Sequence, residues 1–377
     1  MPRFLRPRKG NILVLSAFMM IMVMGLLAFS IDLGYLYVSR DQMQRSADAA
    51  AIAACWDLVD TAAPAGYANT ATTTTKARVT AAAYASMNKV LNNAPTLGEN
   101  DVTVGYLANP SDPSTAMVTS GAFTPNAVNV RVQRSSSQNG SVPLFFGRVF
   151  GLSDLNMQTD ATAAILTSVK GFTNPSTGGN LDILPFALDE ETWGDLLAGG
   201  GTDQWSYDTE TAEVLRGSDG IRECNLYPQG TGAPGNRGTV DIGGQDNSTR
   251  DIARQIVSGV NSADLAHHGG SIQLNSSGVL YLNGDTGISA GVMDELVSIV
   301  GKPRIVPVFR SVTNPGNNAT YSIVKFCGIR IVDVDLRGSI SSKRVMIQPA
   351  NIVTRGGIYS EIPSSSTFIY SPVWLVR

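Results

Sequence analysis

The segment 287–291 (GISAG) has the Gly-x-Ser-x-Gly spacing that holds the nucleophilic serine of many hydrolases on a sharp turn. That chemistry needs a buried apolar strand directly before the serine, a helix after it, and a histidine later in the chain. Here residues 282–286 form a polar turn, and both histidines precede Ser289. Ser289 therefore fits the N-cap of a helix better than a nucleophile. A cell-envelope hydrolase that uses Ser289 is kept as an alternative function.

Metal chemistry has weaker support. His267 and His268 are adjacent, so their rings point in different directions on a helix or a strand, and no nearby cysteine or spaced carboxylate completes a zinc site. Residues 283–287 (NGDTG) resemble half of a calcium loop but lack its further aspartates and its bidentate glutamate. We therefore expect no catalytic, cofactor-binding or metal-binding residues.

The chain has three cysteines, Cys55, Cys224 and Cys327, so they cannot all pair within one chain. Cys224 and Cys327 both lie in the distal part and are candidates for a disulfide if that part occupies an oxidising compartment. Two buried thiols are the alternative.

Composition limits the classes of protein that the chain can belong to. A length of 377 residues predicts two soluble modules beyond any anchor. Charged residues make up only 16 % of the chain, and the net charge is −3. Because no run of Lys and Arg occurs beyond the first ten residues, nucleic-acid binding lacks its electrostatic footprint.

Residues 12–31 carry no charged side chain and predict a transmembrane helix. At about 1.5 Å per residue, a helix of this length crosses a hydrocarbon core of about 30 Å. Residues 1–11 contain four basic and no acidic side chains, whereas mixed charges follow the span from Asp32 onward. The positive-inside rule therefore predicts a cytoplasmic basic tail over 1–11 and everything after Asp32 on the far side of the membrane.

A cleaved signal peptide is the alternative, but the apolar run is longer than the usual 7–15 residue signal core. Met43, Ala47, Ala50 and Ala54 continue one face of a helix, and no proline occurs between residues 12 and 58. We therefore expect the anchor to be retained and to continue as a juxtamembrane spine helix over 32–63.

The sequence around the end of the span resembles the N-terminal module of TadG/TadE-like Flp (Tad) pilus-assembly proteins. The resemblance rests on an Asp-x-Gly pair at the membrane edge followed by a Gln- and Ala-rich helical segment. The matching positions are Asp32, Gly34, Tyr35, Tyr37, Arg40, Gln42, Gln44, Ala47, Asp48, Ala50 and Ala51. The resemblance implies a prepilin-like protein of the bacterial cell envelope, anchored in the inner membrane. Its expected partners are other pilus-assembly proteins that dock on the spine helix, and further copies of itself.

Two departures from the family pattern matter. Pilin processing after Gly10 would favour a glutamate five residues later, where this chain has Leu15. Some TadG-type proteins carry a von Willebrand factor A domain, whose metal site needs Asp-x-Ser-x-Ser. The nearest strings, 112–116 and 246–250, both lack the second serine, so we expect no such domain.

The remaining sequence predicts an α+β fold. Residues 76–168 read as helix, two strands, a short helix over 141–150 and a strand, which gives a small pilin-like α+β module. Residues 70–75 and 171–180 read as linkers. Residues 181–377 predict a mostly β distal module with helices near 189–197, 248–260 and 288–300.

The function expected from the resemblance is a non-enzymatic component of a Tad/Flp-type pilus-assembly or adherence system, with no cofactor. Besides the hydrolase, the other alternative is an envelope ligand-binding protein, which a deep pocket in the distal module would favour.

Overall fold

A computed structural model describes residues 12–59, 70–112, 114–121, 123–226, 238–244, 248–285, 289–313, 319–338, 342–360 and 366–376. The basic tail, which includes Gly10, lies outside these residues. Within them the predicted α+β class is confirmed: one very long helix and a second helix pack on a small sheet, and a mostly β part follows.

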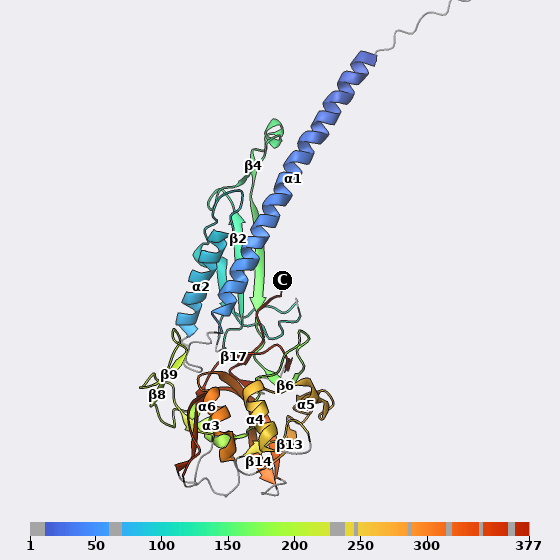
Figure 1. Cartoon of the computed structure of the whole chain (residues 1–377). Coiled ribbons are helices and arrows are strands. Elements are labelled where there is room, and N and C mark those ends of the chain that lie inside the picture. Colours follow the sequence, from blue (N-terminus) through green and yellow to red (C-terminus); the bar gives the residue numbers. More distant parts are fainter. Residues whose placement is uncertain are drawn as a thin grey trace, which may run out of the picture.

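The long helix α1 runs without a break from Ile12 to Trp56. Its N-terminal part is apolar and has no buried residue, and it is long enough to cross a membrane. Figure 1 shows this part of α1 (blue) projecting away from the rest of the chain, whereas its C-terminal half lies beside α2 and β2. One helix thus serves both as the candidate span and as part of the soluble core.

The second helix, α2, spans Thr70–Met87 and begins earlier than the sequence predicts. Residues 70–75 were expected to be a linker because β-branched threonines are poor helix formers. Packing overrides that weak preference. The buried residues Ala77, Ala81 and Ala85 recur every four positions, on one helix face, and pack with α1 in a shared core.

The sheet beneath these helices is antiparallel, in the order β1 (Val102–Gly105), β2 (Ala127–Arg134), β5 (Met157–Ala164) and β21 (Trp374–Leu375). The first three strands confirm the alternating patterns in the sequence. The fourth strand comes from the C-terminal end of the chain, where Trp374 pairs with Ala164. We call α2, these four strands and the C-terminal half of α1 the proximal module; its division from the distal part near residues 168–181 stays a prediction.

The segment 141–150 is not the amphipathic helix that the sequence predicts. It forms a hairpin, in which β3 (Val142–Pro143) pairs with β4 (Asp154–Leu155). Only Gly147–Phe150 is helical, as a single 3-10 turn that ends at Gly151 with a φ of 82°. The amide groups that a helix would have used are instead occupied by a side chain of α1, described below.

The distal module is built on the long strand β15 (Ala319–Asp335). Strand β14 (Pro303–Thr313) pairs along one edge. Along the other edge β13 (Leu280–Asp285), β19 (Ser366–Thr367) and β16 (Arg344–Pro349) follow one another. The remaining strands of this sheet are β7 (Leu188–Asp189), β10 (Cys224–Asn225) and β11 (Thr239–Val240).

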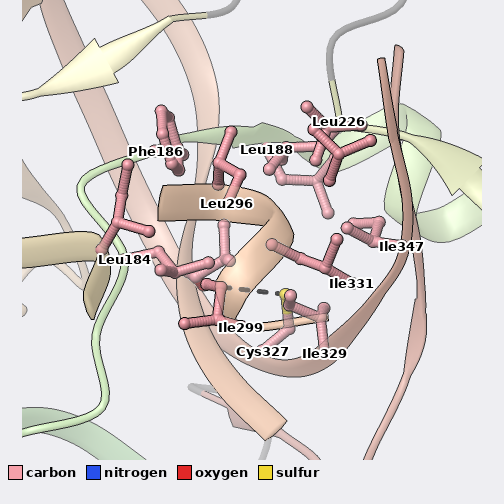
Figure 2. Packing of buried hydrophobic residues seen from close by; sticks show 14 of the residues in the cluster. Leu184, Phe186, Leu188, Leu226, Leu296, Ile299, Cys327, Ile329, Ile331 and Ile347 are labelled. Carbon is pink, nitrogen blue, oxygen red and sulfur yellow. Dashed lines mark hydrogen bonds between the residues drawn. The ribbon is translucent and has the colours of Figure 1, made fainter. Parts of the chain in front are cut away.

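The described residues of the distal module form the helices α3 (Glu190–Leu197), α4 (Thr249–Ser258), α5 (Ser262–Ala266) and α6 (Met293–Ser298). Figure 2 shows Leu296 and Ile299, at α6, packed against Cys327, Ile329 and Ile331 of β15. Helices α3 and α4 confirm the helices predicted near 189–197 and 248–260, and their N-caps are Asp189 and Ser248. The helix predicted over 288–300 is shorter, a 3-10 turn (Ala290–Val292) followed by α6.

The expected linker 171–180 is wrong at its start, because β6 (Val169–Thr173) pairs with β12 (Ser271–Gln273) and β18 (Gly357–Tyr359). The misleading residue is Gly171, which is a close-approach glycine rather than a linker glycine. A Cβ at this position would lie 2.4 Å from the carbonyl oxygen of Ile272, so only glycine fits the strand here.

Gly328, in the middle of β15, carries a stability prediction. A Cβ there would lie 2.4 Å from the carbonyl oxygen of Ala350 and 2.6 Å from that of Phe368, so the C-terminal segment would have to move. We expect Gly328→Ala to lower the free energy of unfolding by about 1–3 kcal/mol, as overpacking does. Gly194→Ala is the control, because it lies in α3 with nothing within 4 Å of the added Cβ and should stabilise by about 0.5–1 kcal/mol. Denaturation of the full chain in detergent measures both free energies of unfolding. Equal changes in the two variants would contradict the close approach of the Ala350 and Phe368 carbonyls to Gly328.

Candidate functional site

The carboxylate of Asp32 accepts hydrogen bonds from the backbone of the β3–β4 hairpin. Its Oδ1 accepts from the amide of Phe145 at 2.8 Å, and its Oδ2 accepts from Phe146 at 3.0 Å and from Gly147 at 2.7 Å. Asp32 is 7 % exposed although it directly follows the apolar span. Three consecutive amides that converge on one anion form a strong, charge-assisted contact. Asp32 is therefore more than a charge that ends the span: it fastens the hairpin to α1.

Tyr35, one turn further along α1, supports the same contact. Its ring meets Phe145 edge-on, with ring centroids 5.1 Å apart and planes at 73°. Aromatic pairs in this geometry are typically worth about 0.5–1.5 kcal/mol beyond the area that they bury. Asp32 and Tyr35 thus hold the hairpin at the place where the apolar part of α1 ends.

The two glutamines of the signature also bond within the chain. The side-chain oxygen of Gln42 accepts from the amide of Leu91 at 2.8 Å, just after α2. The amide nitrogen of Gln44 donates to Asp48 at 2.8 Å and to the carbonyl oxygen of Asp160 in β5 at 3.3 Å. These polar groups position α1 against α2 and the sheet. The sequence predicts instead that the same glutamines dock partner proteins.

The alanines of the signature lie in the proximal core. Ala47, Ala50 and Ala51 have no exposed surface and pack with Met43 and Ala54 against α2 and the sheet. Small residues let another helix or a sheet come close to a helix backbone, and the neighbours of α1 in this structure are the chain's own α2, β2 and β5. This buried face is therefore not available to another protein while the module is folded.

Three signature residues remain exposed: Gly34, Tyr37 and Arg40. At 100° per residue, Gly34 and Tyr37 lie on the side of α1 opposite Asp32 and Ala50. Nothing approaches within 4 Å of a Cβ built on Gly34, and the Tyr37 ring is 65 % exposed. Asp41 and Arg45 form an ion pair further along the same exposed side. This side is the part of the signature that the fold leaves free.

The structure places Ser289 at the N-cap of the turn before α6. Its hydroxyl accepts from the amide of Gly291 at 3.2 Å, and the residue is exposed. This is the helix-cap role that the sequence favours, and the hydrolase alternative gains no support from it. The residues just before Ser289, 286–288, lie outside the described part of the chain.

The two histidines lie at the end of α5. His267 is exposed, whereas His268 is half-buried, and burial lowers the pKa of its imidazole although nearby Asp241 opposes the shift. Across the described residues, no group of three or more His, Cys, Asp and Glu side chains could hold a metal ion.

An open cavity of about 680 Å³ lies in the distal module beside β6 and β12 and bears on the ligand-binding alternative. Its lining includes Lys170, Gln273, Asn275 and Arg310. The Arg310 guanidinium forms an ion pair with Glu190 at 2.7 Å, so its charge is already balanced within the chain. Since the lining is largely solvent-exposed, a ligand there would gain little from leaving water.

Cys224 and Cys327 lie in one core cluster of the distal module. The Cys327 thiol is fully buried and donates to the carbonyl oxygen of Val306 at 3.6 Å. Cys224 pairs with Ile347, which pairs with Ile331, so the two cysteines are two strands apart and four residues out of register. Two strand spacings alone correspond to roughly 10 Å across the sheet, and the four-residue offset adds to it, so the separation exceeds what a disulfide spans. The pairing stays a prediction that this register does not favour.

Cys55, in the proximal core, carries a reactivity prediction. Burial raises the pKa of its thiol to about 12 from an ordinary value of 9.0. Because the thiolate is the reactive form, we expect Cys55 to resist alkylation by iodoacetamide at pH 8 in the folded chain and to react after denaturation. Mass spectrometry of the labelled peptides measures this; rapid labelling of native Cys55 would show that α1 separates from the sheet.

Comparison with known proteins finds a family that the first part of the chain resembles. A TadE/G-like Flp pilus-assembly profile matches residues 10–68, and a Tad-like Flp pilus-assembly profile matches residues 53–163. Over residues 10–163 the chain is therefore similar to the Tad-like Flp pilus-assembly proteins, and the resemblance seen in the sequence is confirmed. These residues contain α1, α2, β1, β2 and nearly all of β5, whereas the distal module lies beyond both matches. No curated protein and no solved structure matches the chain.

Proposed function

We propose that this chain is a non-enzymatic component of a Tad/Flp-type pilus-assembly machine, anchored in the inner membrane by residues 12–31. Similarity to the pilus-assembly family carries the proposal. The direct continuation of an exposed apolar helix into the proximal core supports the anchor. With the basic tail in the cytoplasm, the proximal and distal modules lie outside the cytoplasm.

Within this function, we propose that the free side of the spine helix receives another pilus-assembly protein. Asp32, Gln42, Gln44 and the buried alanines make contacts inside the chain. Gly34, Tyr37 and Arg40 also belong to the signature, but they are exposed and the described residues offer their side chains no hydrogen-bond or ion-pair partner. A photocrosslinking amino acid at Tyr37 should capture a pilus-assembly protein in cells, and the same probe at Leu215 in the distal module is the control. Identical products from both positions would contradict docking on this side.

Deletion and complementation in the cells that carry the protein test the function itself. We expect deletion to remove Flp pili from the cell surface and the wild-type chain to restore them. Ser289→Ala should restore them equally, because Ser289 only caps a turn. Normal pili in the deletion strain would overturn the pilus role, and failure of a normally accumulating Ser289→Ala chain would revive the hydrolase.

A further inference from the structure

The tip of the β3–β4 hairpin exposes a compact set of large apolar side chains. Val149 is 81 % and Phe150 is 83 % exposed, and Arg148 between Gly147 and Val149 is also exposed. We call the exposed apolar residues of this turn the tip patch: Phe145, Phe146, Val149, Phe150 and Leu152. A soluble surface rarely gathers so many apolar residues in one turn without a partner, because each exposed Å² costs about 25 cal/mol relative to burial.

The position of the patch is fixed by the contacts of Asp32. The three amides that bind its carboxylate belong to Phe145, Phe146 and Gly147, at the root of the patch. Asp32 is also the first charged residue after the apolar span, so it marks the level at which α1 leaves the hydrocarbon core. Figure 1 shows the turn (green, above β4) beside α1, at the end of the soluble body that faces the projecting half of the helix.

This position matches the chemistry of the patch. Apolar faces that carry Trp, Phe or Leu insert at the boundary between acyl chains and headgroups, and an arginine beside them can pair with a lipid phosphate. Three features coincide at one level: exposed phenylalanines, the exposed Arg148, and Tyr35 packed on Phe145. The root of the patch contacts Asp32, the residue that directly follows the apolar span.

We propose that the tip patch inserts into the outer interface of the bilayer that α1 crosses. The partner is the lipid surface, at the depth of the headgroup and upper acyl region. A helix alone leaves the soluble modules free to swivel about its axis, whereas a second contact with the bilayer fixes which side of the proximal module faces outward. The exposed side with Gly34 and Tyr37 would then always present the same orientation to the assembly machine. This inference rests on the proposed membrane anchor.

Fluorescence quenching at defined depths tests the inference on the full chain. Single cysteines at Val149, Leu26 or Leu215, in a chain with Cys224→Ser, would carry a small fluorophore; Cys55 and Cys327 are buried and stay unlabelled in the folded chain. The labelled chains are reconstituted into vesicles of phosphatidylcholine and phosphatidylglycerol that contain lipids brominated near the headgroup or near the chain ends. We expect several-fold stronger quenching by shallow bromines at Val149 than at Leu215, and the strongest quenching by deep bromines at Leu26.

The outcomes separate this inference from the anchor. Quenching at Leu26 without quenching at Val149 would overturn the tip insertion and leave the anchor intact, and would point to a protein as the occupant of the patch. No quenching at Leu26 would overturn the anchor itself. Phe150→Asp, added to the Val149 probe, should lower its shallow quenching to near the Leu215 level; since Phe150 is exposed, this change does not disturb the core.

Discussion

Replacing Asp32 by alanine will release the β3–β4 hairpin from α1. The carboxylate accepts three backbone amides at 2.7–3.0 Å, and each hydrogen bond to a charged group contributes about 1.5–3 kcal/mol. Water can replace part of these hydrogen bonds. We therefore expect the free energy of opening the hairpin to fall by about 2–4 kcal/mol in total. Hydrogen exchange should therefore speed up by roughly 30- to 1,000-fold at the amides of residues 145–147.

Two variants make this test specific. Asp41→Ala removes another aspartate of α1, whose pair with Arg45 is exposed, and should change stability by less than about 1 kcal/mol. Asp32→Asn keeps an acceptor oxygen without the charge and should give intermediate exchange. Unchanged exchange at residues 145–147 in Asp32→Ala would show that the hairpin does not depend on α1.

Placing leucine at Ala81 will destabilise the proximal module by about 1–3 kcal/mol or more. Ala81 has no exposed surface and lies in the core that α1, α2 and the sheet share. Larger side chains would force α2 away from α1, because the interior is close-packed and has no room for three additional carbons. Unfolding of the full chain in detergent, followed by circular dichroism, measures the effect.

Ala83→Leu is the matched control in the same helix. Ala83 is exposed, and leucine and alanine have similar helix propensities, so the change should lie within about 0.5 kcal/mol of wild type. A destabilisation at Ala83 equal to that at Ala81 would contradict the packing of α2 on the spine helix.

The sequence predicts the continuity of the spine helix but not its end, because the helix expected to reach residue 63 ends at Trp56. It predicts the contacts of this helix only in part. The apolar span, the absence of proline and the spacing of Met43, Ala47, Ala50 and Ala54 predict one continuous helix, as observed. The same alanines predict a close neighbour without identifying it. Ala77, Ala81 and Ala85, every four residues in α2, carried the matching signal, but the preceding threonines hid the start of that helix.

The contact of Asp32 could not be derived from the sequence. Its partners are backbone amides, which every residue except proline possesses, so residues 145–147 carry no distinguishing side-chain pattern. Only a structure that folds the chain back over 113 residues brings them together. The pairing of β21 with the first sheet could not be predicted either, because Trp374–Leu375 is a two-residue strand with no periodicity of its own.

The location of the full-length chain in its own cells tests the proposed anchor most directly. A C-terminal tag would be followed in inner-membrane, outer-membrane and sheared-surface fractions, and protease would be added to spheroplasts. We predict full-length protein in the inner membrane alone, with the tag digested from outside. A product shortened by about ten residues in the sheared fraction would instead mean that the chain is processed at Gly10 and polymerises as a pilin. Tagged protein that is soluble, or protected from protease, would contradict the anchor and its orientation.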